Sequence, residues 1–251
     1  MAFGTERTSY QTRTVDNAVF DADLRKHMLR VYNYMASGVA LTGIVAALIA
    51  QMAIVTNSTG QIIGLTSFGQ TMFASGFKWI VMLAPLAFIL VLSFGLNRMR
   101  SSTAQAVFWL FAATMGASLS TIFITFTGAS VARVFFITAA AFAGLSLYGY
   151  TTKKDLSGLG TFLIMGLIGI IIAMIVNIFL ASSALQFAIS VIGVIVFAGL
   201  TAYDTQNIKN EYASNYDEET QGKLAISGAL RLYLDFINLF VMLLQLIGDR
   251  R

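Results

Sequence analysis

The stretch LGTFLIMGLIGIIIAMIVNIFLA occupies residues 159–181 and contains no charged side chain. A helix needs about 20 predominantly apolar residues to cross the roughly 30 Å hydrocarbon core of a bilayer. A soluble helix of this length would present a polar face, and only Thr161 and Asn177 are available here to form one. The stretch is therefore predicted to be a membrane-spanning helix.

Six further stretches of similar length and composition accompany it along the chain. An open strand would leave backbone groups without hydrogen bonds in lipid, so each stretch is expected to be helical. The seven predicted spans are residues 31–55, 78–97, 105–127, 131–150, 159–181, 184–203 and 229–247. The predicted fold class is an all-α membrane protein, with an N-terminal tail (residues 1–30) before a seven-transmembrane-helix bundle (residues 31–251).

Composition excludes several classes of function. Hydrophobic residues make up 57% of the chain and charged residues 11%, whereas soluble domains carry about 25% charged residues. There is no cysteine, and the single His27 lies in a charged stretch where it is expected to be solvated. Without a nucleophile–base pair, a histidine metal motif or a phosphate-binding glycine loop, the sequence predicts neither an enzyme nor a resident cofactor. The basic residues flank the spans, which does not indicate nucleic-acid binding.

Two connections between the spans are long. Residues 56–77 are expected to form a polar loop. Residues 205–228 are expected to form a hydrophilic link that carries the acidic run Asp217, Glu218 and Glu219.

The basic residues predict the orientation of the bundle, because cytoplasmic connections collect lysine and arginine. Twelve of the sixteen basic residues lie in the N-terminal tail and the even-numbered connections, and four lie on the other side: Lys78, Arg133, Arg250 and Arg251. The N-terminus is therefore predicted to be cytoplasmic. Seven complete spans would place the C-terminus on the opposite side, whereas a re-entrant last segment would keep both termini cytoplasmic.

Only two of the twelve acidic residues lie within the apolar stretches or at their edge. Asp235 lies inside LYLDFINLF (residues 232–240), and Asp204 closes the sixth span in YDTQ (residues 203–206). An ionisable side chain within a membrane is costly and is a functional hypothesis by default. The predicted orientation places both carboxyl groups toward the cytoplasmic side, so they can lie at similar depth.

Two neighbouring carboxylates in a medium of low dielectric constant can share one proton and titrate as a unit. Such a pair can act as a proton-sensitive latch, and in its deprotonated form it offers hard oxygen ligands to Ca²⁺. Asn238, one helical turn after Asp235, could add a carbonyl oxygen. A structural interpretation is equally open: Arg231 precedes Asp235 by four residues and can neutralise it, while Asp204 can lie at the water boundary.

Two further arginines end the second span on the same side. Arg98 or Arg100 could reach the carboxylate pair and hold it closed, or both could extend to the lipid headgroups. For Arg100 the headgroup position is preferred.

At these residues the sequence resembles the Bax inhibitor family, the transmembrane Bax inhibitor motif proteins, and specifically a bacterial member. The resemblance rests on residues 203–206, on residues 232–240 and on KKDL at residues 153–156. It implies six helices around a central seventh, a multi-pass protein of the cell inner (plasma) membrane, and a pH-sensitive calcium leak. It further implies that Asp204 and Asp235 form a hydrogen-bonded dyad with an arginine of the second span nearby, for which Arg98 is the first candidate and Arg100 the second.

The function expected from the resemblance is a calcium or other cation leak gated by protonation of the dyad. The main alternative is a regulatory protein that binds a membrane-anchored protease through its N-terminal tail. A proton-coupled exchanger would also use a carboxylate pair, but would move protons in fixed ratio to cations.

Overall fold

The computed structural model describes the backbone of residues 5–58 and 61–251, and side chains from Phe20 onward except residues 59–60. Helices dominate, and the only sheet among these residues is a two-stranded hairpin. The elements are α1 (Thr5–Ala53), β1 (Ile54–Thr56), β2 (Ile62–Leu65), α2 (Ser67–Gly69), the π-helical turn η1 (Gln70–Ala74), α3 (Phe77–Gly95), the 3₁₀ turn η2 (Leu96–Arg98), α4 (Ser101–Leu119), α5 (Ile122–Thr125), α6 (Gly128–Thr151), α7 (Ser157–Leu180), α8 (Ser183–Glu211) and α9 (Glu218–Ile247).

Seven helical segments of the described chain are long and apolar enough to cross a membrane, which confirms the predicted number and type of spans. They are Phe20–Ala53, Phe77–Arg98, Ser101–Thr125, Gly128–Thr151, Ser157–Leu180, Ser183–Glu211 and Glu218–Ile247.

The predicted hydrophilic link of residues 205–228 is mostly helical, and the prediction of its extent was wrong. α8 continues to Glu211 and α9 already begins at Glu218, so only six residues separate the helices. Hydropathy detects where a helix leaves the apolar layer, whereas the backbone can continue as a helix into the polar zone. Glu218 and Glu219 occupy the first turn of α9, where negative charge stabilises the helix dipole.

The predicted polar loop of residues 56–77 also contains ordered structure. β1 and β2 pair antiparallel, with Ile54 opposite Leu65 and Val55 opposite Gly64, and α2 and η1 follow before α3 begins. Thr66 caps α2, because its hydroxyl accepts a hydrogen bond from the backbone N–H of Gly69 at 3.1 Å.

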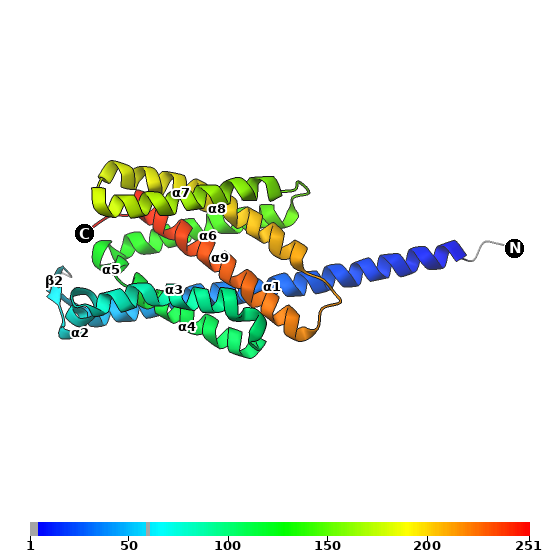
Figure 1. Ribbon diagram of the computed structural model, residues 1–251, viewed down its shortest axis with the longest axis horizontal. Coiled ribbons are helices and arrows are strands. Elements are labelled where there is room, and N and C mark those ends of the chain that lie inside the picture. The colour runs from blue at the N-terminus through cyan, green and yellow to red at the C-terminus, as the bar shows by residue number, and fades with distance from the viewer. Residues whose placement is uncertain (1–4, 59–60) are drawn as a thin grey trace.

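The spans form two groups with α9 between them (Figure 1). α6, α7 and α8 lie on one side of α9, and α1, α3 and α4 lie on the other. α9 contacts α1, α4, α6 and α8, whereas α3 packs mainly on α4 and α7 packs mainly on α8. α9 also has the largest buried share of the seven spans. α9 thus packs against four of the other six spans, and the arrangement of all six around it stays a prediction.

Residues 5–30, which precede the first predicted span, are helical, and the last part of this segment packs against the bundle. α1 passes residue 30 without interruption, and Leu24, His27 and Met28 are buried. The expectation of a solvated His27 was therefore wrong: only 5% of this side chain is exposed, and its ring packs against Tyr212, with 5.2 Å between the ring centroids. The sequence did not reveal this contact because Tyr212 lies far along the chain.

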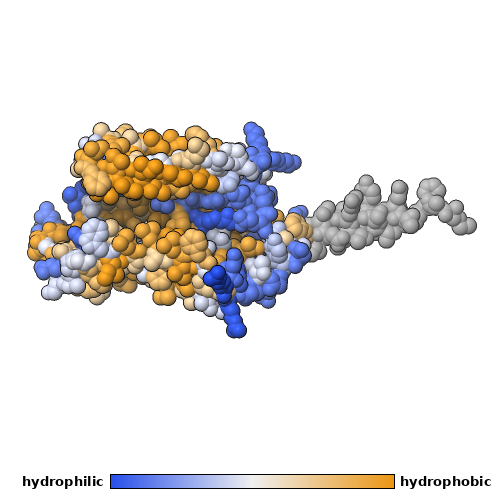
Figure 2. All heavy atoms as spheres, in the orientation of Figure 1, coloured by the Kyte–Doolittle hydropathy of each residue, from blue (hydrophilic) through white to orange (hydrophobic). Residues whose placement is uncertain are grey.

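The outer surface is suited to lipid. Hydrophobic residues cover most of the middle of the face shown in Figure 2, and hydrophilic residues gather toward the end from which α1 projects. Large apolar side chains such as Phe94 and Phe179 are 80% and 83% exposed, a surface that a soluble monomer would not tolerate over so many residues.

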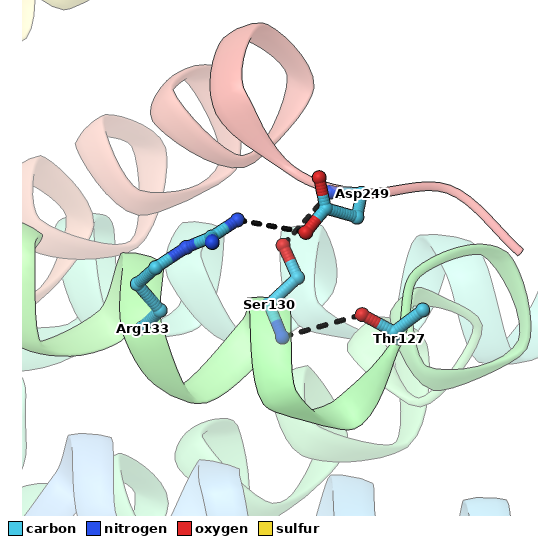
Figure 3. Close-up of polar contacts among 4 residues, drawn as sticks. All are labelled: Thr127, Ser130, Arg133 and Asp249. Carbon is cyan, nitrogen blue, oxygen red and sulfur yellow. Dashed lines mark hydrogen bonds and ion pairs between the residues drawn. The ribbon is translucent and has the colours of Figure 1, made fainter.

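The chain ends at the face of the bundle opposite the N-terminal end of α1 (Figure 1), so the last helix crosses the whole bundle. The residues after α9 return against the start of α6 (Figure 3). The Asp249 backbone N–H donates to the Ser130 hydroxyl at 2.8 Å, and the Asp249 carboxylate forms an ion pair with Arg133 at 2.8 Å. Thr127 caps α6 by accepting from the Ser130 N–H.

Candidate functional site

The structure brings Asp204 and Asp235 together. Asp204 lies on α8 and Asp235 lies on α9, two helices that pack against each other extensively. The two carboxyl groups are close enough for the charge of each to act on the other. Residues 31 positions apart in the sequence thus form one acidic pair within the helical bundle.

The pair is shielded from solvent. Asp235 is 5% exposed and Asp204 is half-buried. The Oδ2 atom of Asp235 is buried and has no hydrogen-bond donor among the described residues. An ionised carboxylate can only accept hydrogen bonds, so two ionised groups cannot bond to each other. A proton held between the two carboxyl groups would provide the missing donor.

Arg231 is the arginine nearest to the pair. Its positive charge acts on both aspartates, although its guanidinium group forms an ion pair with Glu211 at the end of α8. The Nε atom of Arg231 is buried and has no partner among the described residues. Of the sequence-based alternatives, direct neutralisation of Asp235 by Arg231 is therefore not the arrangement observed.

Arg98 and Arg100 do not reach the aspartates. Arg98 ends η2 and Arg100 precedes α4, and both side chains are exposed. Neither forms an ion pair within the part of the chain that the structure describes. The second span ends in the 3₁₀ turn, which leaves Arg98 at the surface of the bundle. Arg231, and not Arg98, is therefore the arginine whose charge acts on the aspartates. The Arg100 side chain is exposed, and its position at the lipid headgroups stays a prediction.

Asn238 is bound to its own helix. Its amide Nδ2 donates to the Leu234 carbonyl at 2.8 Å. Among the described residues, no group of three or more His, Cys, Asp or Glu side chains is placed to hold a metal. Since Ca²⁺ takes six to eight oxygen ligands, Asp204 and Asp235 could supply only part of a coordination shell.

A chain of hydroxyl groups beside the pair was missed by the sequence analysis. The Tyr32 hydroxyl on α1 lies 2.7 Å from the Ser146 hydroxyl on α6, which lies 2.9 Å from the Thr205 hydroxyl on α8. Thr205 directly follows Asp204, so this chain ties α8 to two other spans next to the acidic pair. The sequence does show these polar residues within otherwise apolar spans, but it does not show which of them pair with each other.

Gln206 fixes the same end of α8 to the connection before α7. Its Oε1 accepts from the Leu156 backbone N–H at 2.8 Å, and its Nε2 donates to the Lys154 carbonyl at 2.8 Å. Two of the sequence segments that carried the resemblance, residues 153–156 and 203–206, are thus in direct contact.

Seven apolar spanning helices around a shielded acidic pair define a polytopic membrane protein with ionisable groups in its interior. A family model described as "Inhibitor of apoptosis-promoting Bax1" matches residues 24–251. The chain belongs to the Bax inhibitor family.

Bacterial relatives match nearly the whole chain. An uncharacterised protein of Rickettsia prowazekii is 48% identical over 244 residues, which cover 97% of this chain and 98% of the relative. The protein named inner membrane protein YbhL of Escherichia coli K12 is 45% identical over 232 residues, covering 92% and 94%. A protein of Caulobacter vibrioides is 44% identical over 232 residues, covering 92% and 91%.

Proposed function

We propose that the protein is a pH-sensitive cation leak, with calcium as a transported ion, in which protonation of Asp204 and Asp235 controls the open state. The single observation that supports this proposal is the proximity of two carboxyl groups on packed helices inside a membrane bundle. Such groups are expensive to place in a bilayer, and they are retained where a proton or cation must be bound.

The proposed gate is the contact between α8 and α9. A proton shared by Asp204 and Asp235 joins the two helices. Loss of that proton leaves two like charges in contact, and this favours either separation of the helices or entry of a cation. The charged groups that face the pair are Arg231, which opposes the repulsion, and Glu211, which holds Arg231 at the end of α8.

The proposed location is a bacterial inner membrane, as the name of the Escherichia coli relative states for that protein. The N-terminal end of the bundle is proposed to face the cytoplasm, because twelve of the sixteen basic residues belong to that end. The acidic pair would then lie closer to the cytoplasmic side than to the outer side.

The test is calcium efflux from vesicles that contain the purified protein, measured across a pH series. Asp204→Asn and Asp235→Asn each remove one titrating group from the pair. We expect either change to make efflux nearly independent of pH, because an amide carries no charge and the remaining carboxylate then has no like charge to repel. An unchanged pH response in both variants would refute the proposal.

Asp155→Asn is the matched control. Asp155 is exposed before α7, and hydrogen bonds from the Ser157 hydroxyl and backbone N–H lower its pKa. A carboxyl group whose pKa is lowered stays ionised throughout a series near neutral pH, so its loss should leave the pH response intact.

A second proposal is regulation of a membrane-anchored protease, and it is supported by the projection of α1 beyond the rest of the bundle (Figure 1). A variant that lacks residues 1–19 separates the two proposals when it is measured both for calcium efflux in the vesicles and for its effect on the membrane-anchored protease. A leak should persist in this variant, whereas modulation of a protease through the projecting segment should be lost.

A further inference from the structure

A deep groove separates α1 from α6. Its larger part is a cavity of about 720 Å³, lined by α1 from Arg25 to Ala40, by α6 from Phe135 to Tyr150, and by Phe236 of α9. A second cavity of about 370 Å³ continues from it toward the other end of the bundle and shares Val39, Ala40, Phe135 and Phe236 with the first. Phe236 forms part of the lining where the two cavities meet.

The groove is as long as the hydrocarbon core of a bilayer is thick. Its α1 wall extends from Arg25 to Ala46, and 21 residues of helix rise about 30 Å, the thickness of the hydrocarbon core. Small residues on both walls, including Ala36 on α1 and Ala143 on α6, keep the groove open. An occupant of this space must come from the membrane, because both walls belong to spanning helices.

The two ends of the groove differ in charge. At the end nearer the N-terminus, Arg25 lines the groove, is exposed and forms no ion pair within the described residues. Tyr150 closes the opposite wall there, and Lys209 lies over its ring and donates to its carbonyl at 2.9 Å. The second cavity is lined from Val39 to Phe240 with no charged side chain among the described residues.

We propose that this groove is a binding site for an anionic phospholipid. The phosphate group lies at Arg25, with Lys209 of α8 adding positive charge from behind Tyr150, and an acyl chain extends along the groove over Phe135, Phe142 and Phe236. Basic side chains at the membrane surface attract anionic headgroups. The larger cavity, whose α1 wall rises about 18 Å from Met28 to Ala40, is long enough for an acyl chain of one leaflet. The inference is independent of the proposed leak.

Lipid bound here would contact α9, the helix that carries Asp235. Phe236 directly follows Asp235 on α9, and the Tyr32–Ser146 hydrogen bond crosses between the two walls. The lipid would therefore fill the space between α1 and α6 and pack against α9 at Phe236.

The test is native mass spectrometry of the full chain in detergent, with phosphatidylglycerol and phosphatidylcholine added in equal amounts. We expect one phosphatidylglycerol molecule to be retained in preference to phosphatidylcholine. Arg25→Gln should lower that preference about fivefold, the effect of one basic residue near an anionic lipid. Lys26→Gln is the matched control, because Lys26 is equally exposed but does not line the groove, and the preference should remain.

A second pair of variants tests the apolar part. Ala143→Trp places an indole ring in the groove and should remove both lipids, whereas Ala140→Trp, on the same helix and outside the groove, should not. Equal binding of the two lipids, or equal effects of Arg25→Gln and Lys26→Gln, would overturn the proposal. A dimer that Ala143→Trp dissociates would also overturn it, because a second copy would then be the occupant. Arg25 is exposed, so its variant remains informative even if Ala143→Trp does not fold.

Discussion

At the scale of single residues, the position of Asp204 depends on how closely α8 approaches α6. Gly149 on α6 is buried against the backbone of Ala202 on α8, and a Cβ atom built at Gly149 would lie 2.2 Å from the Ala202 carbonyl oxygen. No flexible side chain can yield there, so any larger residue must push the helices apart. Ala202 precedes Asp204 by two residues, and this contact therefore helps to set the depth of the acidic pair.

We expect Gly149→Ala to destabilise the protein by about 1–3 kcal/mol, the usual cost of overpacking a close contact. The measurement is the thermal midpoint of the purified protein in detergent. Gly144→Ala is the control, since Gly144 lies on the same helix with nothing within 4 Å of the added atom. That change should be neutral or stabilising, because alanine favours a helix over glycine. Equal midpoints for the two variants would contradict the proposed role of Gly149.

At the scale of elements, the C-terminal segment closes the bundle chiefly through its backbone. Thr127 donates its N–H to the Asp249 carbonyl at 3.0 Å, and Arg251 donates its N–H to the Thr125 carbonyl at 3.0 Å. The Arg133–Asp249 ion pair beside them is 55% and 65% exposed, and exposed ion pairs contribute about 0–1 kcal/mol. The backbone bonds are therefore expected to dominate.

Removal of residues 249–251 should increase amide hydrogen exchange in residues 122–131, because the Thr127 N–H loses its acceptor and the α5–α6 turn loses its packing partner. Asp249→Asn should change exchange little, since it weakens only the exposed ion pair. Hydrogen exchange followed by mass spectrometry of this segment distinguishes the two variants. Similar exchange in both would show that the ion pair, not the backbone, closes this end.

At the scale of the whole molecule, the distribution of basic residues predicts which end faces the cytoplasm. The chain contains no cysteine, so single cysteines introduced at its two ends can be labelled without background. Lys153→Cys lies in the connection after α6, and Lys78→Cys lies at the start of α3, at the opposite end; both sites are exposed. We expect an impermeant thiol reagent added to intact bacterial cells with a permeabilised outer membrane to label Cys at position 78 only. Labelling at position 153 alone would reverse the proposed orientation.

The sequence by itself determined the membrane class, the number of helical spans and the two acidic residues within them, because hydropathy and the cost of an ionisable group in lipid are local properties of the chain. It did not determine how far α8 and α9 extend beyond the apolar layer, since backbone hydrogen bonds continue where hydropathy falls. Only the tertiary structure decided that Arg231 pairs with Glu211, that Arg98 remains at the surface and that His27 is buried against Tyr212. These choices depend on which helices pack together and how closely, and the order of residues along one helix does not contain that information.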